Sequence, residues 1–598
     1  MLDFKNNAHK IFVEALKKFA QAKNVDIDDS ILSGVVAEDP PKKEMGDVGI
    51  PCFTMSKIFR MAPAVIATEI SKIICDDSFP LKNEAAEFGK FFADGPYVNV
   101  ALNRSAYAPK LFERIESDGE LFGAVDNSGK KILNKKRIMI EFSSPNTNKP
   151  LHLGHLRNDA LGESISRILL FAGAEVYKVC IINNRGVHIC KSMLAYKKFH
   201  EEHSHTPENC GVKSDRFVGD CYVEFENYRK AQPEGVAEEE AQSLLRLWES
   251  GDEKTHQLWK TMNDWAISGI KSTYDRTGVS FDKFYFESDT YLKGKDEVLR
   301  GLKDGIFTRK EDGSVQADLS PIGLDTKILL RKDGTSLYIT QDLGTAIARH
   351  EDWPFDRMIY VVGNEQNYHF KVLFYLLKSL GYTWSDELFH LSYGMVNLPD
   401  GKMKSREGTV VDADDLIDGL RDLASGEIIQ KGRENEVENI SEVSEKIAIG
   451  ALHYFLLQAT PEKDMLFDPR ASLSFNGNTG PYLQYTGARM CSIFQKIEEK
   501  FDTADFSLLT SDEEWALIKT LSSFPGVICE ASEKLNPSLV AGFCYELAKN
   551  FAVFYHECPV ATCKDENLRI ARVALMASVQ KILKKAMDLI LVPFLEKM

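Results

Sequence analysis

The chain of 598 residues lacks any apolar run near the roughly 18 residues that a membrane-spanning helix requires. Its N-terminus starts an amphipathic pattern and has no apolar centre of the kind found in secretory signal peptides. Its eleven cysteines include no Cys-x-x-Cys pair, and the two closest in sequence, Cys558 and Cys563, lie five residues apart. These absences predict a cytoplasmic protein that has reduced thiols, no membrane anchor and no metal site.

Positive charge is also in short supply. The 73 Lys and Arg residues are outnumbered by 89 Asp and Glu residues, which gives a net charge of −16. Binding to nucleic acid needs basic side chains at the phosphates. Residues 471–598 are nearly balanced, however, with 13 basic and 15 acidic side chains. Because a local basic face can exist on an acidic protein, the net charge neither supports nor excludes an RNA partner.

The length predicts three or four domains, because a chain of this size exceeds what one core can organise. From Lys136 onward, apolar strands alternate with amphipathic helices, a pattern typical of a parallel sheet with crossover helices. The expected strands are at residues 138–140, 176–182, 327–330, 336–342 and 358–362. The expected helices are at residues 412–465, 480–500, 511–534, 537–557 and 567–590.

The most informative segment is Glu141-Phe-Ser-Ser-Pro-Asn-Thr-Asn-Lys-Pro-Leu-His-Leu-Gly-His155, which follows the first predicted strand. It contains neither Gly-x-Gly-x-x-Gly nor Gly-Lys-Ser/Thr, so it is not a dinucleotide or P-loop motif. A turn from a strand into a helix binds anions, because free N–H groups and the helix dipole point at the ligand. Gly154 lets a flat base approach the backbone. His152 and His155 can donate hydrogen bonds to a phosphate.

This segment resembles the ATP-binding signature of class I aminoacyl-tRNA synthetases, and most closely the arginyl-tRNA synthetase form, in which Ser-Pro-Asn and a lysine precede the histidines. The mobile second motif of the class has a counterpart in Gly401-Lys-Met-Lys-Ser-Arg-Glu-Gly408. Ser405 stands where most class I enzymes have a second lysine. Arginyl enzymes commonly lack that lysine, and the resemblance implies that Lys149 replaces it. The division of labour among Lys149, Lys402 and Arg406 stays open.

Other segments extend the resemblance over nearly the whole chain. Gly46-Asp-Val-Gly49 and Gly95-Pro-Tyr-Val-Asn-Val100 resemble the N-terminal domain of the family, and Gly480-Pro-Tyr-Leu-Gln-Tyr-Thr-Gly-Ala-Arg489 resembles the start of its anticodon-binding domain. The implied fold is a Rossmann-type α/β catalytic domain, with an N-terminal α+β domain and a C-terminal all-α helical bundle. The predicted boundaries are 1–105 for a tRNA-elbow-binding domain, 106–132 for a linker, 133–400 for the catalytic domain with an insertion at about 195–290, 401–465 for a basic mobile loop and helical junction, and 466–598 for the anticodon-binding domain.

The resemblance implies ligation of L-arginine to its tRNA through an arginyl-adenylate, with ATP as substrate, Mg²⁺ at the phosphates and a monomeric enzyme that binds no DNA. The residues implied as catalytic are Lys149, His152, His155, Lys402 and Arg406. Those implied to bind ATP are His152, Gly154, His155, Gly363, Glu365 and Lys402. Those implied to bind arginine are Glu141, Ser143, Asn146, Tyr338, Asp342 and Gln366.

Two alternatives stay open at this point. A relative without catalytic activity could bind tRNA or protein as a module, although His152, His155 and Lys402 are all retained. A class I synthetase of different specificity is the other. A cysteinyl enzyme should carry zinc ligands near its site, and a glutamyl enzyme should have cations where Glu141 and Asp342 stand. Arginine-dependent exchange of pyrophosphate into ATP discriminates between these possibilities.

Overall fold

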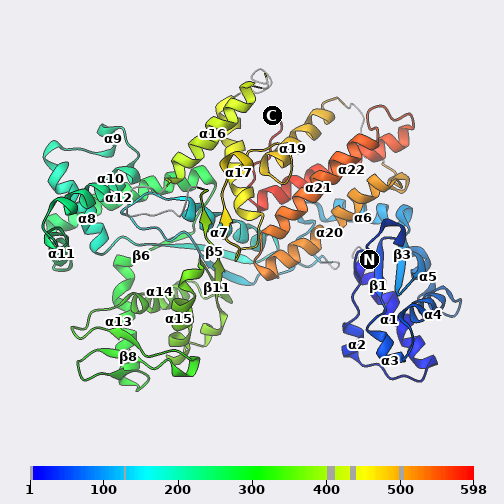
Figure 1. The fold of residues 1–598 in the computed structure, drawn as a ribbon, viewed down its shortest axis with the longest axis horizontal. Coiled ribbons are helices and arrows are strands. Elements are labelled where there is room, and N and C mark those ends of the chain that lie inside the picture. Colours follow the sequence, from blue (N-terminus) through cyan, green and yellow to red (C-terminus); the bar gives the residue numbers. More distant parts are fainter. Residues whose placement is uncertain (1–3, 127–128, 400–410, 431, 433–438, 497–503) are drawn as a thin grey trace. The chain divides into compact units, whose positions relative to one another are not determined.

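The computed structural model describes residues 4–126, 129–399, 411–430, 432, 439–496 and 504–598 (Figure 1). The predicted Lys402 and Arg406 therefore lie outside the described residues. The chain divides into two compact units. The first comprises residues 1–132, 490–529 and 543–585; the second comprises residues 133–489, 530–542 and 586–598. All described residues of the predicted site belong to the second unit.

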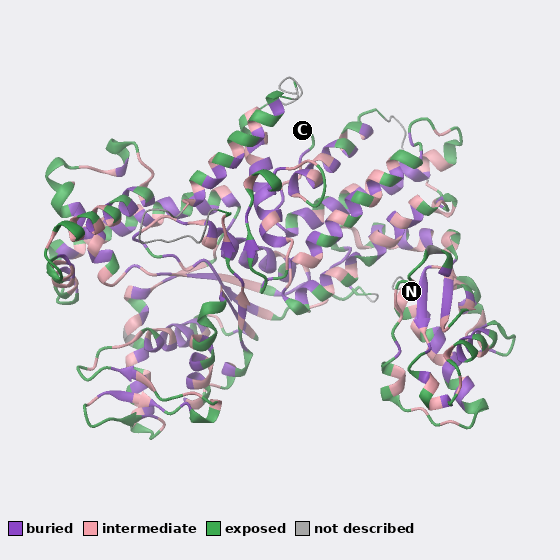
Figure 2. Ribbon diagram, viewed as in Figure 1, coloured by how far each residue is buried: buried purple, intermediate pink, exposed green. Residues whose placement is uncertain are grey.

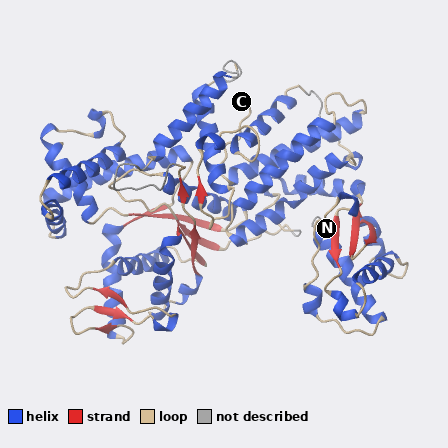
Figure 3. Cartoon of the chain, viewed as in Figure 1, coloured by secondary structure: helices blue, strands red, loops and turns tan. Residues whose placement is uncertain are grey.

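A five-stranded parallel sheet in the order β11-β10-β4-β5-β6 lies at the centre of the second unit (Figure 3). Its strands are β4 (Arg137–Glu141), β5 (Glu175–Ile182), β6 (Lys283–Phe286), β10 (Arg357–Gly363) and β11 (Leu388–Tyr393). The chain runs from the central strand β4 to β5 and β6, and later returns to β10 on the other side of β4. Because the strand order reverses between β4 and β10, a ligand site is expected beyond the carboxyl ends of these two strands.

Helices connect the strands of this sheet. The crossover from β4 to β5 is α7 (Leu153–Phe171). Between β5 and β6 lie α8 (Val187–Phe199), α9 (Pro207–Cys210), α10 (Ser214–Ala231), α11 (Val236–Glu249) and α12 (Glu253–Thr277). Between β6 and β11 lie α13 (Glu287–Lys303), α14 (Tyr338–Asp352) and α15 (Asn367–Ser379). One apolar cluster packs the sheet against α13, α14 and α15, and a separate cluster packs α8, α10, α11 and α12 against one another (Figure 2).

The predicted strand at residues 336–342 is wrong, because helix α14 already begins at Tyr338. The aromatic and β-branched residues there favour a strand locally. The burial pattern has helical spacing instead, with Ile339, Leu343 and Ile347 all inside the core. The predicted strand at 327–330 is confirmed as β9 (Lys327–Leu330), but it belongs to a small antiparallel sheet with β7 (Thr308–Arg309) and β8 (Val315–Ala317).

Beyond β11, the short strand β12 (Val396–Asn397) pairs with β13 (Met465–Leu466). Helices α16 (Ala413–Gln430) and α17 (Ile440–Leu457) lie within the region 412–465 that was predicted to be helical, and α18 (Pro469–Ser472) comes after it. The fully buried Arg157 of α7 joins these pieces. Its guanidinium donates to the carbonyls of Gly394 at 3.3 Å, Leu456 at 2.5 Å and Pro461 at 3.0 Å. Buried cations need such partners, so this side chain fixes the neighbouring loops against α7.

The first unit contains an antiparallel sheet in the order β1-β3-β2, formed by β1 (Val48–Pro51), β2 (Gly89–Asp94) and β3 (Tyr97–Leu102). Its helices are α1 (Phe4–Ala22), α2 (Asp29–Ser33), α3 (Met55–Phe59), α4 (Pro63–Cys75), α5 (Lys82–Phe88) and α6 (Arg104–Asp118). The buried carboxylate of Asp47 accepts hydrogen bonds from the backbone N–H of Leu102 at 2.9 Å and from Trp515 Nε1 at 2.8 Å. It thereby ties the sheet to a C-terminal helix of the same unit.

The C-terminal helices are α19 (Gly480–Phe494), α20 (Asp512–Lys534), α21 (Ser538–Glu557) and α22 (Glu566–Leu589). Each of the four predicted helices of the bundle is therefore confirmed. Among the described residues, no helix combines the length and the apolar character needed to cross a bilayer.

Candidate active site

The segment Lys149–His155, here called the histidine turn, leads into helix α7. His152 is the N-cap residue of α7, and its Nδ1 atom accepts a hydrogen bond from the backbone N–H of Gly154 at 3.1 Å. The Nδ1 atom of His155 accepts from the backbone N–H of His152, also at 3.1 Å. The two histidines thus form a reciprocal capping box, with their ring centres 3.9 Å apart.

This capping box determines the protonation of both rings. In each imidazole Nδ1 accepts a hydrogen bond, so a neutral ring carries its proton on Nε2. Burial, and secondarily the charge of Lys149, lowers the pKa of His152 to about 4. Burial also holds the pKa of His155 well below its usual value, with His152 and Lys149 acting in the same direction. At neutral pH both rings are therefore neutral donors at the positive end of a helix dipole.

After residue 410 the described chain resumes beside the histidine turn. Before residues 400–410, the carbonyl of Gly394 accepts from Arg157 of α7. After them, Asp412 forms a β-bridge with His152, and the backbone N–H of Ala413 donates to the carbonyl of Leu151 at 2.9 Å. Burial raises the pKa of Asp412 to about 6, and its neighbouring carboxylates add to the shift. Residues 412 and 413, which follow the basic segment predicted to close over ATP, therefore lie against this turn.

A cavity of 1520 Å³ opens at the carboxyl ends of the sheet strands. Its walls include Lys149 and His152 of the histidine turn, and Tyr338 and Asp342 at the start of α14. Pockets for one small molecule are typically about 300–1,000 Å³. The cavity therefore has room for two substrates, and it lies at the place that the strand order indicates.

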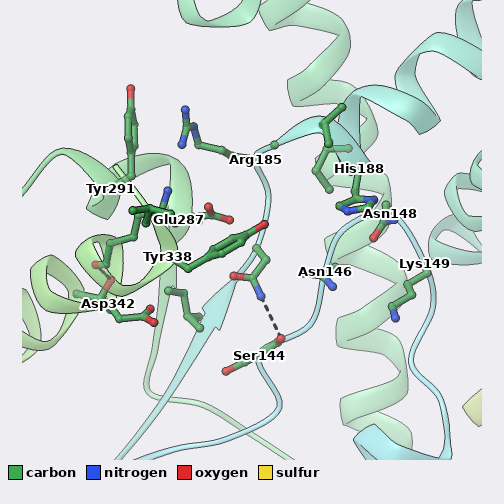
Figure 4. Close-up of a pocket in the computed structure, with 18 of the residues that line it drawn as sticks. Ser144, Asn146, Asn148, Lys149, Arg185, His188, Glu287, Tyr291, Tyr338 and Asp342 are labelled. Carbon is green, nitrogen blue, oxygen red and sulfur yellow. Dashed lines mark hydrogen bonds between the residues drawn. The ribbon is translucent and has the colours of Figure 1, made fainter. Parts of the chain in front are cut away.

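A second group of side chains, here called the carboxylate pocket, consists of Glu287, Tyr338 and Asp342. In the view of Figure 4 these three lie on one side of the cavity, and Asn146 and Lys149 lie on the other. Glu287 begins α13 directly after β6, and Asp342 lies in the second turn of α14. Asp342 Oδ2 is 2.5 Å from His369 Nε2. The pocket therefore presents two acidic side chains from different helices.

Glu287 is buried. Its pKa is raised to about 7, mainly by this burial; Arg185 opposes the rise and Asp342 contributes to it. Burial without full neutralisation marks a carboxylate that would gain from a cationic ligand. Arg185 is committed elsewhere, since its guanidinium lies 3.9 Å from the ring centre of Tyr291 and pairs with Glu249 at 2.8 Å. The aromatic Tyr338 is 74% exposed although it lines the cavity. Its ring is thus available to a bound molecule.

Glu141, predicted to bind arginine, ends the central strand β4 and is buried. One carboxylate oxygen accepts from Ser144 Oγ at 3.0 Å, and the other pairs with the buried guanidinium of Arg349. Burial lowers the pKa of the Arg349 guanidinium, but the charge of Glu141 opposes this effect, and the net shift is upward. Glu141 lines the cavity with its charge already compensated from within the protein.

The other predicted residues separate into two groups. Asn146 and Gln366 line the cavity, on the loop after β4 and on the 3₁₀ turn Asn364–Gln366 after β10. Ser143 does not line it: its hydroxyl lies 2.6 Å from the hydroxyl of Tyr274, and its N–H donates to Asn158. The remaining four, Gly154, His155, Gly363 and Glu365, are not among the residues that line the cavity.

Sequence reasoning missed Glu287, Arg185 and His369. Glu287 was assigned to the insertion, whose predicted end near residue 290 hides the end of β6 at Phe286. The pattern Lys283-Phe-Tyr-Phe286 followed by an acidic residue is the same strand-end signal that was used elsewhere. That signal could have identified Glu287. The partnership of His369 with Asp342 depends on the packing of α15 against α14 and has no counterpart in the sequence.

Three families match consecutive parts of the chain. Residues 121–468 match the family described as "tRNA synthetases class I (R), catalytic domain". Residues 6–102 match "Arginyl tRNA synthetase N terminal domain", and residues 483–598 match "DALR anticodon binding domain". Together these matches cover most of the sequence in the order that the resemblance predicted.

Individual relatives agree with the families. The arginine–tRNA ligase of Treponema denticola is 54% identical over the full length of both chains. The arginine–tRNA ligase of Treponema pallidum subsp. pallidum is 52% identical over 94% of this chain and 95% of the relative. The structure of Thermus thermophilus arginyl-tRNA synthetase superposes with a TM-score of 0.76 over 99% of this chain and 100% of the other, at 24% identity. This last likeness shows the fold.

Proposed function

The chain belongs to the arginyl-tRNA synthetases of class I and is an arginine–tRNA ligase, and from this premise we propose how its own residues divide the reaction. The enzyme activates arginine with ATP and transfers it to tRNA. In the first step the arginine carboxylate attacks the α-phosphorus, and pyrophosphate leaves. The nucleophile is already an anion, so this step needs no general base; it needs positioning and stabilisation of developing charge.

His152 and His155 supply that stabilisation through their Nε2–H groups. The observation that supports this role is the capping box, which occupies both Nδ1 atoms and leaves Nε2 as the donor atom of each ring. Neutral donors do not bind the ground-state phosphate as strongly as cations would, but their hydrogen bonds strengthen as negative charge grows on the phosphate oxygens. The helix dipole of α7 acts in the same direction.

The departing pyrophosphate is neutralised by Lys149, with Lys402 and Arg406 added from the segment outside the described residues. Burial lowers the pKa of Lys149, so a bound anion would favour its charged form. A bound phosphate supplies that anion. Mg²⁺, which commonly enters such sites with the substrate phosphates, would share with Lys149 the neutralisation of the departing pyrophosphate. Gly154, Gly363 and Glu365 border the nucleotide.

The carboxylate pocket receives the arginine side chain. Glu287 and Asp342 pair with the planar donor fork of the guanidinium, and the exposed ring of Tyr338 packs on its face. Asn146 and Gln366 bind the α-amino group. Because Glu141 is already paired with the buried Arg349, Glu287 takes the arginine-binding role that the resemblance assigned to Glu141. Ser143 acts from behind the cavity wall, through Tyr274 and Asn158.

The remaining parts handle the tRNA. Residues 1–105 contact its elbow and residues 466–598 contact its anticodon; the family matches at 6–102 and 483–598 support this division. Residues 106–132 link the N-terminal domain to residues 133–400, and residues 401–465 join the catalytic domain to the bundle. The enzyme is a monomer of the cytoplasm that binds neither DNA nor membranes. All eleven cysteines are free in the described residues, in keeping with a reducing compartment.

Exchange of radioactive pyrophosphate into ATP tests the assignment directly. It should depend on arginine, and citrulline should not replace arginine, because citrulline has the same shape without the charge that Glu287 and Asp342 require. Each assay is run with and without unfractionated tRNA, since exchange only with tRNA would show that the tRNA completes the active site. Folded protein that binds tRNA but exchanges under neither condition would contradict the catalytic assignment.

A further inference from the structure

A cluster of ligand-type side chains lies where the chain leaves α8 and meets α10. His200, Cys221 and Glu224 each place one possible metal-ligand atom within 4.8 Å of the other two. The three provide a nitrogen, a sulfur and an oxygen donor. The arginine–tRNA ligase reaction uses none of them.

The local structure fixes these side chains in one place. Cys221 and Glu224 are three residues apart in α10, so they project from the same face of the helix. Cys221 is fully buried in the apolar cluster of the insertion helices. His200 directly follows the last residue of α8, and its backbone N–H still bonds to the carbonyl of Tyr196 at 2.9 Å. Since the ligands come from separate segments, cysteine spacing along the sequence predicts no metal site here.

The two nitrogens of His200 have different partners. Nε2 lies 2.7 Å from Glu224 Oε2, and Nδ1 lies 3.0 Å from His205 Nδ1. Histidines that bind metals commonly use one ring nitrogen as the ligand and the other for a hydrogen bond that fixes the orientation of the ring. His200 is arranged in this way, with Nε2 against Glu224 and Nδ1 held by His205.

Other ionisable groups lie close to the cluster. The carboxyl of Asp220 interacts electrostatically with Arg216 as well as with Glu224 and His200, and the thiol of Cys210 interacts with that of Cys221. A divalent cation bound by the three ligands would compensate the carboxylate of Glu224 and displace the proton from the buried thiol.

We propose that His200 Nε2, Cys221 Sγ and Glu224 bind a divalent cation of the zinc class, with water in the fourth position and His205 orienting His200. Mixed N, S and O donors favour Zn²⁺ over Mg²⁺ or Ca²⁺, which prefer oxygen alone. The ligands of a tetrahedral zinc site are about 3.4–3.8 Å apart, given the usual metal–ligand lengths. A rotamer adjustment of about 1 Å therefore brings the cluster to that geometry.

The site ties the segment between α8 and α10 to α10 itself. The same helix contributes Gly219, Tyr222 and Val223 to the wall of the active-site cavity. A bound ion consequently fixes one wall of that cavity while taking no part in the chemistry. Because the proposed role is structural, the metal site can lie in the helical insertion, outside the reaction centre.

The test uses the full chain, stripped with a chelator and titrated with Zn²⁺ alone and with Co²⁺ alone. One zinc ion per chain should bind, and Co²⁺ should give the near-ultraviolet charge-transfer absorption of a thiolate–cobalt bond. Cys221→Ala should abolish that absorption. Glu224→Gln should keep the absorption but weaken zinc binding by at least about 100-fold, because it removes a ligand rather than an outer contact.

Cys190→Ala is the matched control. Cys190 is a buried thiol of the same apolar cluster, lies on α8 and is not part of the ligand group. It should leave zinc stoichiometry and the cobalt spectrum unchanged. Circular dichroism of the metal-free variants establishes that each is folded; should Cys221→Ala unfold, Glu224→Gln, at a partly exposed position, decides the matter. Zinc binding that survives both Cys221→Ala and Glu224→Gln, or a wild-type cobalt complex without the thiolate band, overturns the proposal.

Discussion

The histidine turn and the carboxylate pocket face each other across one cavity, but they are built differently. The histidine turn is seven consecutive residues in which the two histidine side chains accept hydrogen bonds from the backbone of the turn itself. The carboxylate pocket is made of residues 287, 338 and 342, which meet because β6, α13 and α14 pack together. The first is a local structure that a sequence can specify directly, and the second exists only after the sheet has formed. The predictions below test whether the two also separate functionally, into transition-state stabilisation and arginine recognition.

The largest effect is expected from neutralising the carboxylate pocket. The double change Glu287→Gln and Asp342→Asn keeps the shape and removes both charges that face the guanidinium. The specificity constant for arginine should fall by about 10⁴-fold, because a buried charged partner is left without compensation. The fall should appear mainly in KM for arginine, while KM for ATP stays unchanged. Pyrophosphate exchange at varied arginine and varied ATP measures both constants.

Glu249→Gln is the control for that double change, since Glu249 also lines the cavity but pairs with Arg185 at its rim. It should alter KM for arginine by less than about threefold, because Glu249 contacts Arg185 and is not one of the two carboxylates proposed to face the guanidinium. If the double variant raises KM for ATP as much as KM for arginine, the two regions are not functionally separate.

A smaller loss, confined to the rate, is expected at the histidine turn. His152→Asn or His155→Asn should lower kcat by about 10²–10³-fold, the usual cost of one donor that acts on transition-state charge. KM for arginine should hardly change. His188→Asn, which changes a histidine of the cavity wall outside the histidine turn, should reduce kcat by less than tenfold. A rise in KM for arginine without a fall in kcat at position 152 or 155 would reassign these rings to substrate binding.

The pH dependence of arginine binding should identify Glu287. Its pKa is raised to about 7 in the free protein, so below pH 7 the carboxyl is increasingly protonated. A bound guanidinium favours the ionised form and must then displace the proton. Arginine should therefore bind about tenfold more weakly at pH 6 than at pH 8, since one protonation governs the site. Calorimetric titration at the two pH values measures this ratio, and in Glu287→Gln it should approach one.

The same contrast explains which features could be predicted from the sequence. His152 and His155 were identified because a strand, a turn and a helix follow one another without interruption, and Lys149 was identified from its place in the family signature. The four C-terminal helices were identified from their apolar periodicity alone. Tyr338 and Asp342 were also identified as site residues, but in a strand; tertiary packing selects a helix for residues whose local preference is extended.

Long-range partners could not be predicted in this way. Arg349 lies 208 residues from Glu141, and its helix faces inward only because the sheet covers it. No pattern near Glu141 signals that a guanidinium from the same chain will compensate its charge. Glu287 was hidden for a related reason, because the preceding helical segment obscured the last strand on that side of the sheet. Partners of buried charges are a property of the fold.

The smallest effect on arginine recognition should come from Glu141, which provides the sharpest test of this interpretation. Glu141→Gln should change KM for arginine by less than about threefold, because the pair with Arg349 already uses this carboxylate. It should nevertheless lower the free energy of unfolding by about 3–5 kcal/mol, since it leaves the guanidinium of Arg349 buried and uncompensated. Replacing both partners, as Glu141→Leu with Arg349→Met, should restore much of that stability, because an apolar pair carries no desolvation cost. Urea unfolding of the wild type and of these two variants measures the stability, and pyrophosphate exchange measures KM. A KM that rises in Glu141→Gln as far as in Glu287→Gln would return Glu141 to the arginine site and make the carboxylate pocket a three-carboxylate site.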